Sequence, residues 1–81
     1  MAHLVPPFEL SRKIGEVVDI DAATVGALLD TCIARYGAPF KAAIAGATIV
    51  VNGRSINLLE GRRTPLGPAD SVWLLRPSAG G

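Results

Sequence analysis

VGALLDTCIARY, residues 25–36, carries the clearest periodic pattern in the chain. Its apolar side chains recur at i, i+3, i+4, i+7, i+8 and i+11, which places them on one face of an α-helix. Thr24 precedes the helix as an N-cap, Gly37 follows it as a C-terminal cap, and Pro39 blocks its continuation. The sequence therefore predicts one main helix with a single apolar stripe of Val25, Leu28, Leu29, Cys32, Ile33 and Tyr36.

Upstream of this helix, two short segments have the composition of β-strands. Residues 4–10 form a candidate first strand, although Pro6-Pro7 implies that it begins late or carries a bulge, because proline donates no ladder hydrogen bond. Residues 11–15 are typical of a polar turn. Residues 16–20 follow as a second strand, with Val18 and Ile20 on one face and Val17 on the other.

Downstream, residues 38–47 are ambiguous between a short helical turn and a buried loop. Residues 48–52 predict a strand that ends in the turn signal Asn52-Gly53. A short return strand over 55–59, a turn-rich stretch over 60–70 and a last strand over 72–75 complete the order. This order predicts an α+β fold, a β-grasp with a mixed four- to five-stranded sheet and one main helix packed across one face.

Composition and charge narrow the class of protein. The 81 residues are 49% hydrophobic and 19% charged, which suits one small folded domain. The net charge of +1 gives no overall field for nucleic acid or an anionic membrane. A single cysteine excludes a disulfide framework and a CxxC zinc site. With neither a signal peptide nor an apolar spanning run, we expect a cytoplasmic protein.

Three blocks of the sequence stand out together. They are ATVGALL at 23–29, Val51-Asn52-Gly53, and Thr64-Pro65-Leu66 followed by Asp70-Ser71-Val72, Pro77 and Gly80-Gly81. Together these blocks resemble the MoaD/ThiS family of ubiquitin-like sulfur carriers. In the third block, residues 68–70 read Pro-Ala-Asp where Asp-Gly-Asp is common in the family, a departure that touches a turn. The resemblance covers residues 17–81 and is weak before that.

The resemblance implies that the protein is a co-substrate and no enzyme. In the family, an E1-like partner uses ATP and Mg²⁺ to adenylate the terminal carboxylate, here that of Gly81, and a sulfur donor then displaces AMP to leave a thiocarboxylate. No cofactor or metal is expected on the carrier itself. Residues 1–76 would form the β-grasp domain, and residues 77–81 a flexible tail whose slim members are Ser78, Ala79, Gly80 and Gly81.

Candidate docking residues lie on the last strand and on nearby turns. One alternating pair of that strand should be buried and the other exposed. In the family, the sheet face beside the tail docks the partner, so Trp73 and Leu75 are candidates. Arginines could add a docking face for an acidic partner surface, but solvated arginines on turns are the more common outcome. These arginines are Arg54, Arg62, Arg63 and Arg76.

The remaining reactive side chains favour no intrinsic chemistry. Cys32 falls in the helix stripe, so we expect a buried, inert thiol. His3, the only histidine, sits in a start expected to be mobile, with no cysteine or carboxylate cluster beside it in the sequence, so no metal site is expected. No Ser/His/Asp or Cys/His constellation can be assembled.

The sulfur acceptor stays open at this point. A molybdopterin synthase large subunit and a cysteine-synthase-like enzyme are favoured about equally. The stretch NGRSINLLEGRRTPL at 52–66 is longer than in many MoaD sequences, and it resembles the CysO-like carriers that feed cysteine synthesis or carriers recruited to sulfur-containing secondary metabolites. A ubiquitin-like modifier joined to lysines through Gly81 would carry the same C-terminal residues. A β-grasp interaction domain that never uses its tail is the third reading.

Overall fold

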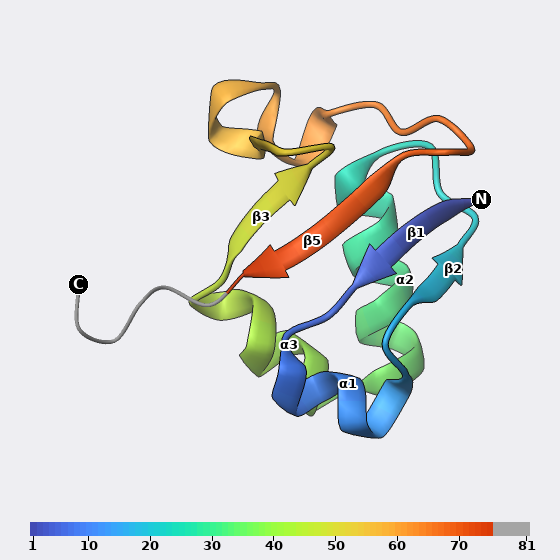
Figure 1. Cartoon of the computed structure of the whole chain (residues 1–81), viewed down its shortest axis with the longest axis vertical. Coiled ribbons are helices and arrows are strands. Elements are labelled where there is room, and N and C mark those ends of the chain that lie inside the picture. The colour runs from blue at the N-terminus through green and yellow to red at the C-terminus, as the bar shows by residue number, and fades with distance from the viewer. Residues whose placement is uncertain (76–81) are drawn as a thin grey trace.

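One mixed sheet organises the molecule, with its helices gathered on one face and at one end (Figure 1). The computed structural model describes residues 1–75. The strands are β1 (Ala2–Val5), β2 (Val18–Ile20), β3 (Thr48–Val51), β4 (Arg54–Ser55) and β5 (Ser71–Leu75). The helices are α1 (Phe8–Ile14), α2 (Val25–Tyr36) and α3 (Ala38–Ala45), and two 3₁₀ turns are η1 (Ile56–Leu58) and η2 (Gly61–Arg63).

The first and last strands lie side by side in the centre of the sheet, whose order is β2-β1-β5-β3-β4. β1 and β5 run parallel, with Val5 opposite Trp73, while the remaining neighbours are antiparallel. This confirms the predicted β-grasp with a mixed, five-stranded sheet. Because β5 is flanked on both sides, its position is fixed by two ladders of hydrogen bonds.

α2 begins and ends where the sequence predicts. The Thr24 hydroxyl oxygen accepts a hydrogen bond of 3.1 Å from the backbone N–H of Ala27, which satisfies one of the free donors at the helix N-terminus. Gly37, at φ 76°, donates its N–H to the carbonyl of Ile33 at 2.8 Å. The positive φ stops α2 and starts α3, where Pro39 lies in the first turn.

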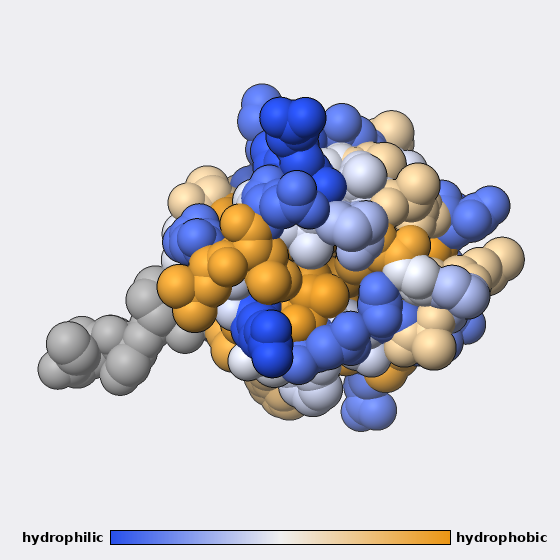
Figure 2. Space-filling view, turned by 90° about the horizontal axis from the view of Figure 1, so that it is seen from above, coloured by the Kyte–Doolittle hydropathy of each residue, from blue (hydrophilic) through white to orange (hydrophobic). Residues whose placement is uncertain are grey.

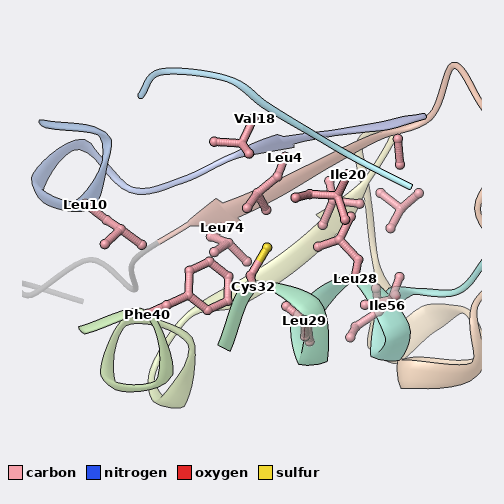
Figure 3. Packing of buried hydrophobic residues seen from close by; sticks show 14 residues of the cluster. Leu4, Leu10, Val18, Ile20, Leu28, Leu29, Cys32, Phe40, Ile56 and Leu74 are labelled. Carbon is pink, nitrogen blue, oxygen red and sulfur yellow. The ribbon is translucent and has the colours of Figure 1, made fainter. Parts of the chain in front are cut away.

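The core lies between α2, α3 and one face of the sheet, which we call the inner face (Figure 3). Leu4, Val72 and Leu74 project from the sheet, and the side chains of α2 meet them. Four members of the predicted stripe are buried, and Ile33 and Tyr36 pack partly buried beside them. The largest fully buried side chains are Leu4, Ile20, Val25, Leu28, Leu29, Cys32, Phe40, Val72 and Leu74.

The predicted strand over residues 4–10 is wrong beyond Val5. The strand begins early, at Ala2, and after two buried prolines the chain turns into α1. The alternation of apolar residues imitates a strand, but Pro6 and Pro7 cannot donate to a ladder, and Pro7 has the extended φ and ψ of a helix N-cap. The segment predicted as a polar turn, 11–15, is the second half of α1 and its cap.

Two further segments differ from the prediction. The ambiguous stretch 38–47 contains α3, so among the described residues the main helix is accompanied by two shorter ones. The return strand predicted over 55–59 is reduced to β4 at residues 54–55, because the Ser55 hydroxyl accepts from the N–H of Asn57 and starts η1. The predicted turn at Asn52-Gly53 is confirmed, with φ of 51° and 87°.

Candidate functional site: the tail edge and the outer face

The tail residues predicted to carry the chemistry, Ser78, Ala79, Gly80 and Gly81, lie outside the described residues, as does Arg76. The structure does show where the chain leaves the sheet. Leu75 is opposite Thr48 at the end of β5, and Val5 ends the parallel strand β1 beside it. We call this end of the sheet, marked by Val5, Thr48 and Leu75, the tail edge (Figure 1).

β5 alternates as predicted between buried and exposed side chains. Val72 and Leu74 are 0% and 2% exposed on the inner face, whereas Trp73 and Leu75 are each 45% exposed on the opposite one. The register places Val5 and Val50 on either side of Trp73. We call this apolar surface, formed by Val5, Val50, Trp73 and Leu75, the outer face, and it reaches the tail edge.

A hydrogen bond between the side chains of His3 and Asp19 borders the outer face on the side of β2. His3 Nδ1 lies 2.5 Å from Asp19 Oδ1 across the antiparallel ladder of β1 and β2. The prediction that His3 lies in a mobile start is wrong, because β1 pairs on both sides and holds it. Within residues 1–75, no group of three or more His, Cys, Asp or Glu side chains is placed to hold a metal ion.

Three of the predicted arginines lie within the described residues, on or beside β4 and η2. Arg54 pairs with Val51, whose other neighbour Val72 is near the start of β5. Arg62 donates to Asp30 at 2.7 Å and to the carbonyl of Gly26 at 3.4 Å, so it joins η2 to α2. Arg63 is exposed on η2. Their docking role stays a prediction, and for Arg62 the structure shows an intramolecular partner.

An open groove of about 580 Å³ lies at the end of the sheet where β5 begins, opposite the tail edge. Figure 2 looks onto this end and shows hydrophobic side chains gathered among hydrophilic ones. Hydrogen bonds from the N–H of Gly67 and from the Asn52 amide lower the pKa of the Asp70 carboxyl in the groove wall. The Asp70 carboxylate therefore joins the turn at Asn52 to the turn at Gly67 through two hydrogen bonds. The groove is lined by Val51, Asn52, Arg54, Leu59, Glu60, Thr64, Pro65 and Asp70.

Cys32 is confirmed as a core residue. Its side chain is 0% exposed between α2 and the sheet (Figure 3). Burial raises the pKa of the thiol from 9.0 to about 11, with Arg35 opposing the shift. Since the thiolate is the nucleophile and metal ligand, Cys32 is unreactive near neutral pH in the folded protein.

Sequence reasoning missed Phe8. The sequence predicts Phe8 within a strand, but Phe8 opens α1, where its side chain is 78% exposed. Only Pro6 and Pro7 stand between Val5, at the end of β1, and Phe8, so the first turn of α1 lies close to the tail edge. Figure 1 shows α1 at the end of the sheet where β1 stops. A Pro-Pro pair followed by Phe-Glu-Leu-Ser-Arg-Lys is compatible with a capped helix, and that reading would have placed Phe8 on its exposed side.

The model of the ThiS family matches residues 8–81. The chain belongs to the ThiS family. The resemblance to the MoaD/ThiS carriers is thereby confirmed, and the protein is a ubiquitin-like sulfur carrier rather than an enzyme. No curated protein sequence gives a significant match to this ThiS-family chain.

Solved structures share the fold of this ThiS-family protein at low sequence identity. A chain in the crystal structure of the BexX/CysO complex from Amycolatopsis orientalis superposes with a TM-score of 0.85 and 21% identity over the whole of both chains. Small archaeal modifier protein 1 from Methanosarcina acetivorans gives 0.84 and 21%, over 99% of this chain and 95% of that one. CysO from Mycobacterium tuberculosis gives 0.83 and 19%, over 96% and 100%.

No described helix of this ThiS-family protein, within residues 1–75, is long and apolar enough to cross a membrane.

Proposed function

We propose that this protein carries sulfur as a thiocarboxylate on Gly81. An E1-like enzyme uses ATP and Mg²⁺ to join the Gly81 carboxylate to AMP, with pyrophosphate leaving. A donor of sulfide-level sulfur then forms a C–S bond at the activated carbonyl carbon while the C–O bond to AMP breaks, which leaves a thiocarboxylate on the carrier and free AMP. The observation that carries the proposal is the ThiS-family match, which extends to Gly81.

The residue types suit this chemistry. Gly80 and Gly81 have no Cβ, so they can enter a narrow channel with torsions closed to other residues and leave both faces of the carbonyl open to attack. All the ATP-binding and metal-binding groups belong to the partner in this proposal. The carrier contributes position, because β5 is fixed between β1 and β3 and sets the point from which Gly81 is presented.

The proposed partners are the activating enzyme and a downstream sulfur-accepting synthase, with no nucleic acid or membrane involved. The outer face is the proposed docking surface, because its apolar side chains adjoin the tail edge. The related fold in the BexX/CysO structure occurs in a complex of two proteins, which supports a protein partner for this chain. For the acceptor we keep a molybdopterin synthase large subunit and a cysteine-synthase-like enzyme. Thiocarboxylated carrier incubated with each would show which one consumes it.

The decisive experiment changes the position of the reacting carboxylate. One residue added after Gly81 moves the activated carbon outward and brings a side chain into a site fitted to glycine. Deletion of Gly81 retracts the carboxylate by about 3.3–3.6 Å. A misplacement of 1 Å can cost about a hundredfold in rate, so we expect both variants to be nearly inactive in ATP-dependent AMP release.

Thermal melts of the same three proteins provide the control. The core side chains lie within residues 2–74, so neither change should shift the melting temperature. Equal AMP release from the native, extended and deleted proteins would contradict the sulfur-carrier proposal.

A second function has one observation in its favour. A protein described as an archaeal modifier shares the fold over 99% of this chain. A modifier would form an isopeptide bond between Gly81 and a lysine of another protein. Covalent high-mass adducts in cells that vanish on deletion of Gly81 would support it, and a thiocarboxylate without such adducts would support the carrier alone.

A further inference from the structure

An exposed aromatic side chain stands beside the tail edge without a role in the fold. Phe8 is 78% exposed, whereas Leu10, on the same helix, is 5% exposed and anchors α1 to the core. The backbone around Phe8 is fixed. Ser11 donates its N–H to the carbonyl of Pro7 at 2.8 Å and its hydroxyl to the carbonyl of Phe8 at 2.6 Å. Phe8 is therefore presented to solvent from an ordered turn.

The length of the chain after Leu75 limits where a partner can sit. Gly81 lies six positions after Leu75, so the reacting carboxylate lies within about 20–22 Å of Leu75 even for a fully extended chain. This is shorter than the 31 Å long axis of the domain. An enzyme that encloses Gly81 and the residues before it must therefore bring its surface against the tail edge.

Phe8 falls within the area that such an enzyme covers. β1 lies about 4.8 Å from β5, and three residues lead from Val5 to Phe8, at most about 11 Å of chain. A protein interface of standard size buries about 800 Å² on each partner, which corresponds to a patch about 16 Å in radius. A patch centred on the tail edge thus includes Phe8 as well as the outer face.

We propose that Phe8 is an anchor residue for the activating enzyme, which receives it in an apolar recess beside the channel for the tail. This inference rests on the proposed function and adds a contact on α1 to the outer face. Aromatic side chains are enriched at the centres of protein interfaces, and an anchor held in place before binding loses little entropy. In this arrangement α1 contributes to the choice of partner as well as to the fold.

The test compares four full-length carriers in ATP-dependent AMP release with the cognate E1-like enzyme. Phe8→Ser removes the anchor and Phe8→Leu keeps an apolar side chain. Leu58→Ser is the matched control, because Leu58 is 82% exposed on η1, which follows β4 at the end of the sheet where β5 begins. We expect Phe8→Ser to raise the KM for the carrier about tenfold with kcat unchanged, since the lost contact binds ground and transition states equally.

Phe8→Leu should recover most of the native KM, and Leu58→Ser should stay within about twofold of it. If the native carrier supports AMP release and Phe8→Ser has the native KM, the anchor role is wrong while the sulfur-carrier proposal stands. An equal rise in KM for Leu58→Ser would also overturn it, because the effect would not belong to the tail edge. A native carrier that releases no AMP would remove both proposals.

Discussion

Cys32 shows how position decides the chemistry of a residue in this protein. The thiol is the only one in the chain, yet it lies in the core with a pKa of about 11. Burial disfavours the thiolate, so the folded protein keeps the proton to higher pH than the unfolded chain does. The sulfur that a carrier holds must therefore sit elsewhere, in agreement with the proposed role of Gly81.

The raised pKa of Cys32 predicts that the native protein is more stable than Cys32→Ala at pH 7 and less stable at pH 10.5. Above pH 9 the unfolded thiol ionises while the folded thiol stays protonated, so the free energy of unfolding falls between pH 9 and about 11. At pH 10.5 the loss is about 2 kcal/mol. Cys32→Ala loses a small buried group, which costs about 1 kcal/mol at pH 7, but it cannot show the alkaline loss.

Urea unfolding of the native protein and Cys32→Ala at pH 7 and pH 10.5 measures the reversal. The variant should be less stable than the native protein at pH 7 and more stable at pH 10.5. The same difference between the two proteins at both pH values would show that the thiol is not shielded.

At the scale of elements, α2 and η2 are held together across a close approach. Gly26 lies in the first turn of α2, and a Cβ built there would lie 3.0 Å from the carbonyl oxygen of Arg62 and 3.2 Å from its Cβ. Arg62 also binds Asp30 on the same helix. The glycine therefore allows the 52–66 segment to pack directly on the helix.

Gly26→Ala sets two effects against each other. Alanine favours the helix by about 1 kcal/mol, whereas overpacking against a backbone oxygen costs about 1–3 kcal/mol. We expect the steric term to win and the free energy of unfolding to fall by about 1 kcal/mol. Ala34→Gly, on the exposed side of α2, is the control for helix propensity alone. A variant Gly26→Ala that melts higher than the native protein would mean that η2 can move away at little cost.

The sequence predicts those elements whose signals are local. The caps and stripe of α2 lie within or next to the helix, and the Asn52-Gly53 turn needs only two residues with positive φ. α1 escapes prediction because its seven residues bury one side chain, Leu10, and show no repeated stripe. The contact between Arg62 and Asp30 joins residues 32 positions apart, so only the folded chain reveals it.

The residues of the candidate site likewise include some that the sequence predicts and others that only the tertiary structure reveals. The alternation of Trp73 and Leu75 with buried neighbours follows from the period of a strand, so the sequence predicts which pair is exposed. The sequence does not predict Phe8, because its exposure depends on where α1 lies against the sheet. The positions of the arginines likewise depend on the tertiary fold, since Arg54 pairs with Val51 opposite the start of β5 and Arg63 lies on η2.

At the scale of the whole molecule, the buried core and the proposed docking surface lie on opposite faces of the sheet. The inner face holds the core, whereas Trp73 on the outer face is 45% exposed. Trp73→Ser should therefore cost about 1 kcal/mol or less in stability. It should weaken binding to the activating enzyme about tenfold or more, as measured by titration calorimetry. Leu58→Ser again serves as the control, and unchanged affinity of Trp73→Ser would show that the outer face is not the docking surface.

The central place of β5 has a mechanical consequence. An enzyme that draws in the segment after Leu75 pulls along the axis of a strand that is bonded to β1 on one side and β3 on the other. Such a pull loads both ladders in shear, so their hydrogen bonds resist together and cannot break one at a time. The domain should therefore withstand a force applied at its C-terminal end without stepwise loss of strand pairing. Single-molecule stretching between Ala2 and Leu75 should meet a higher rupture force than stretching across β3 and β4.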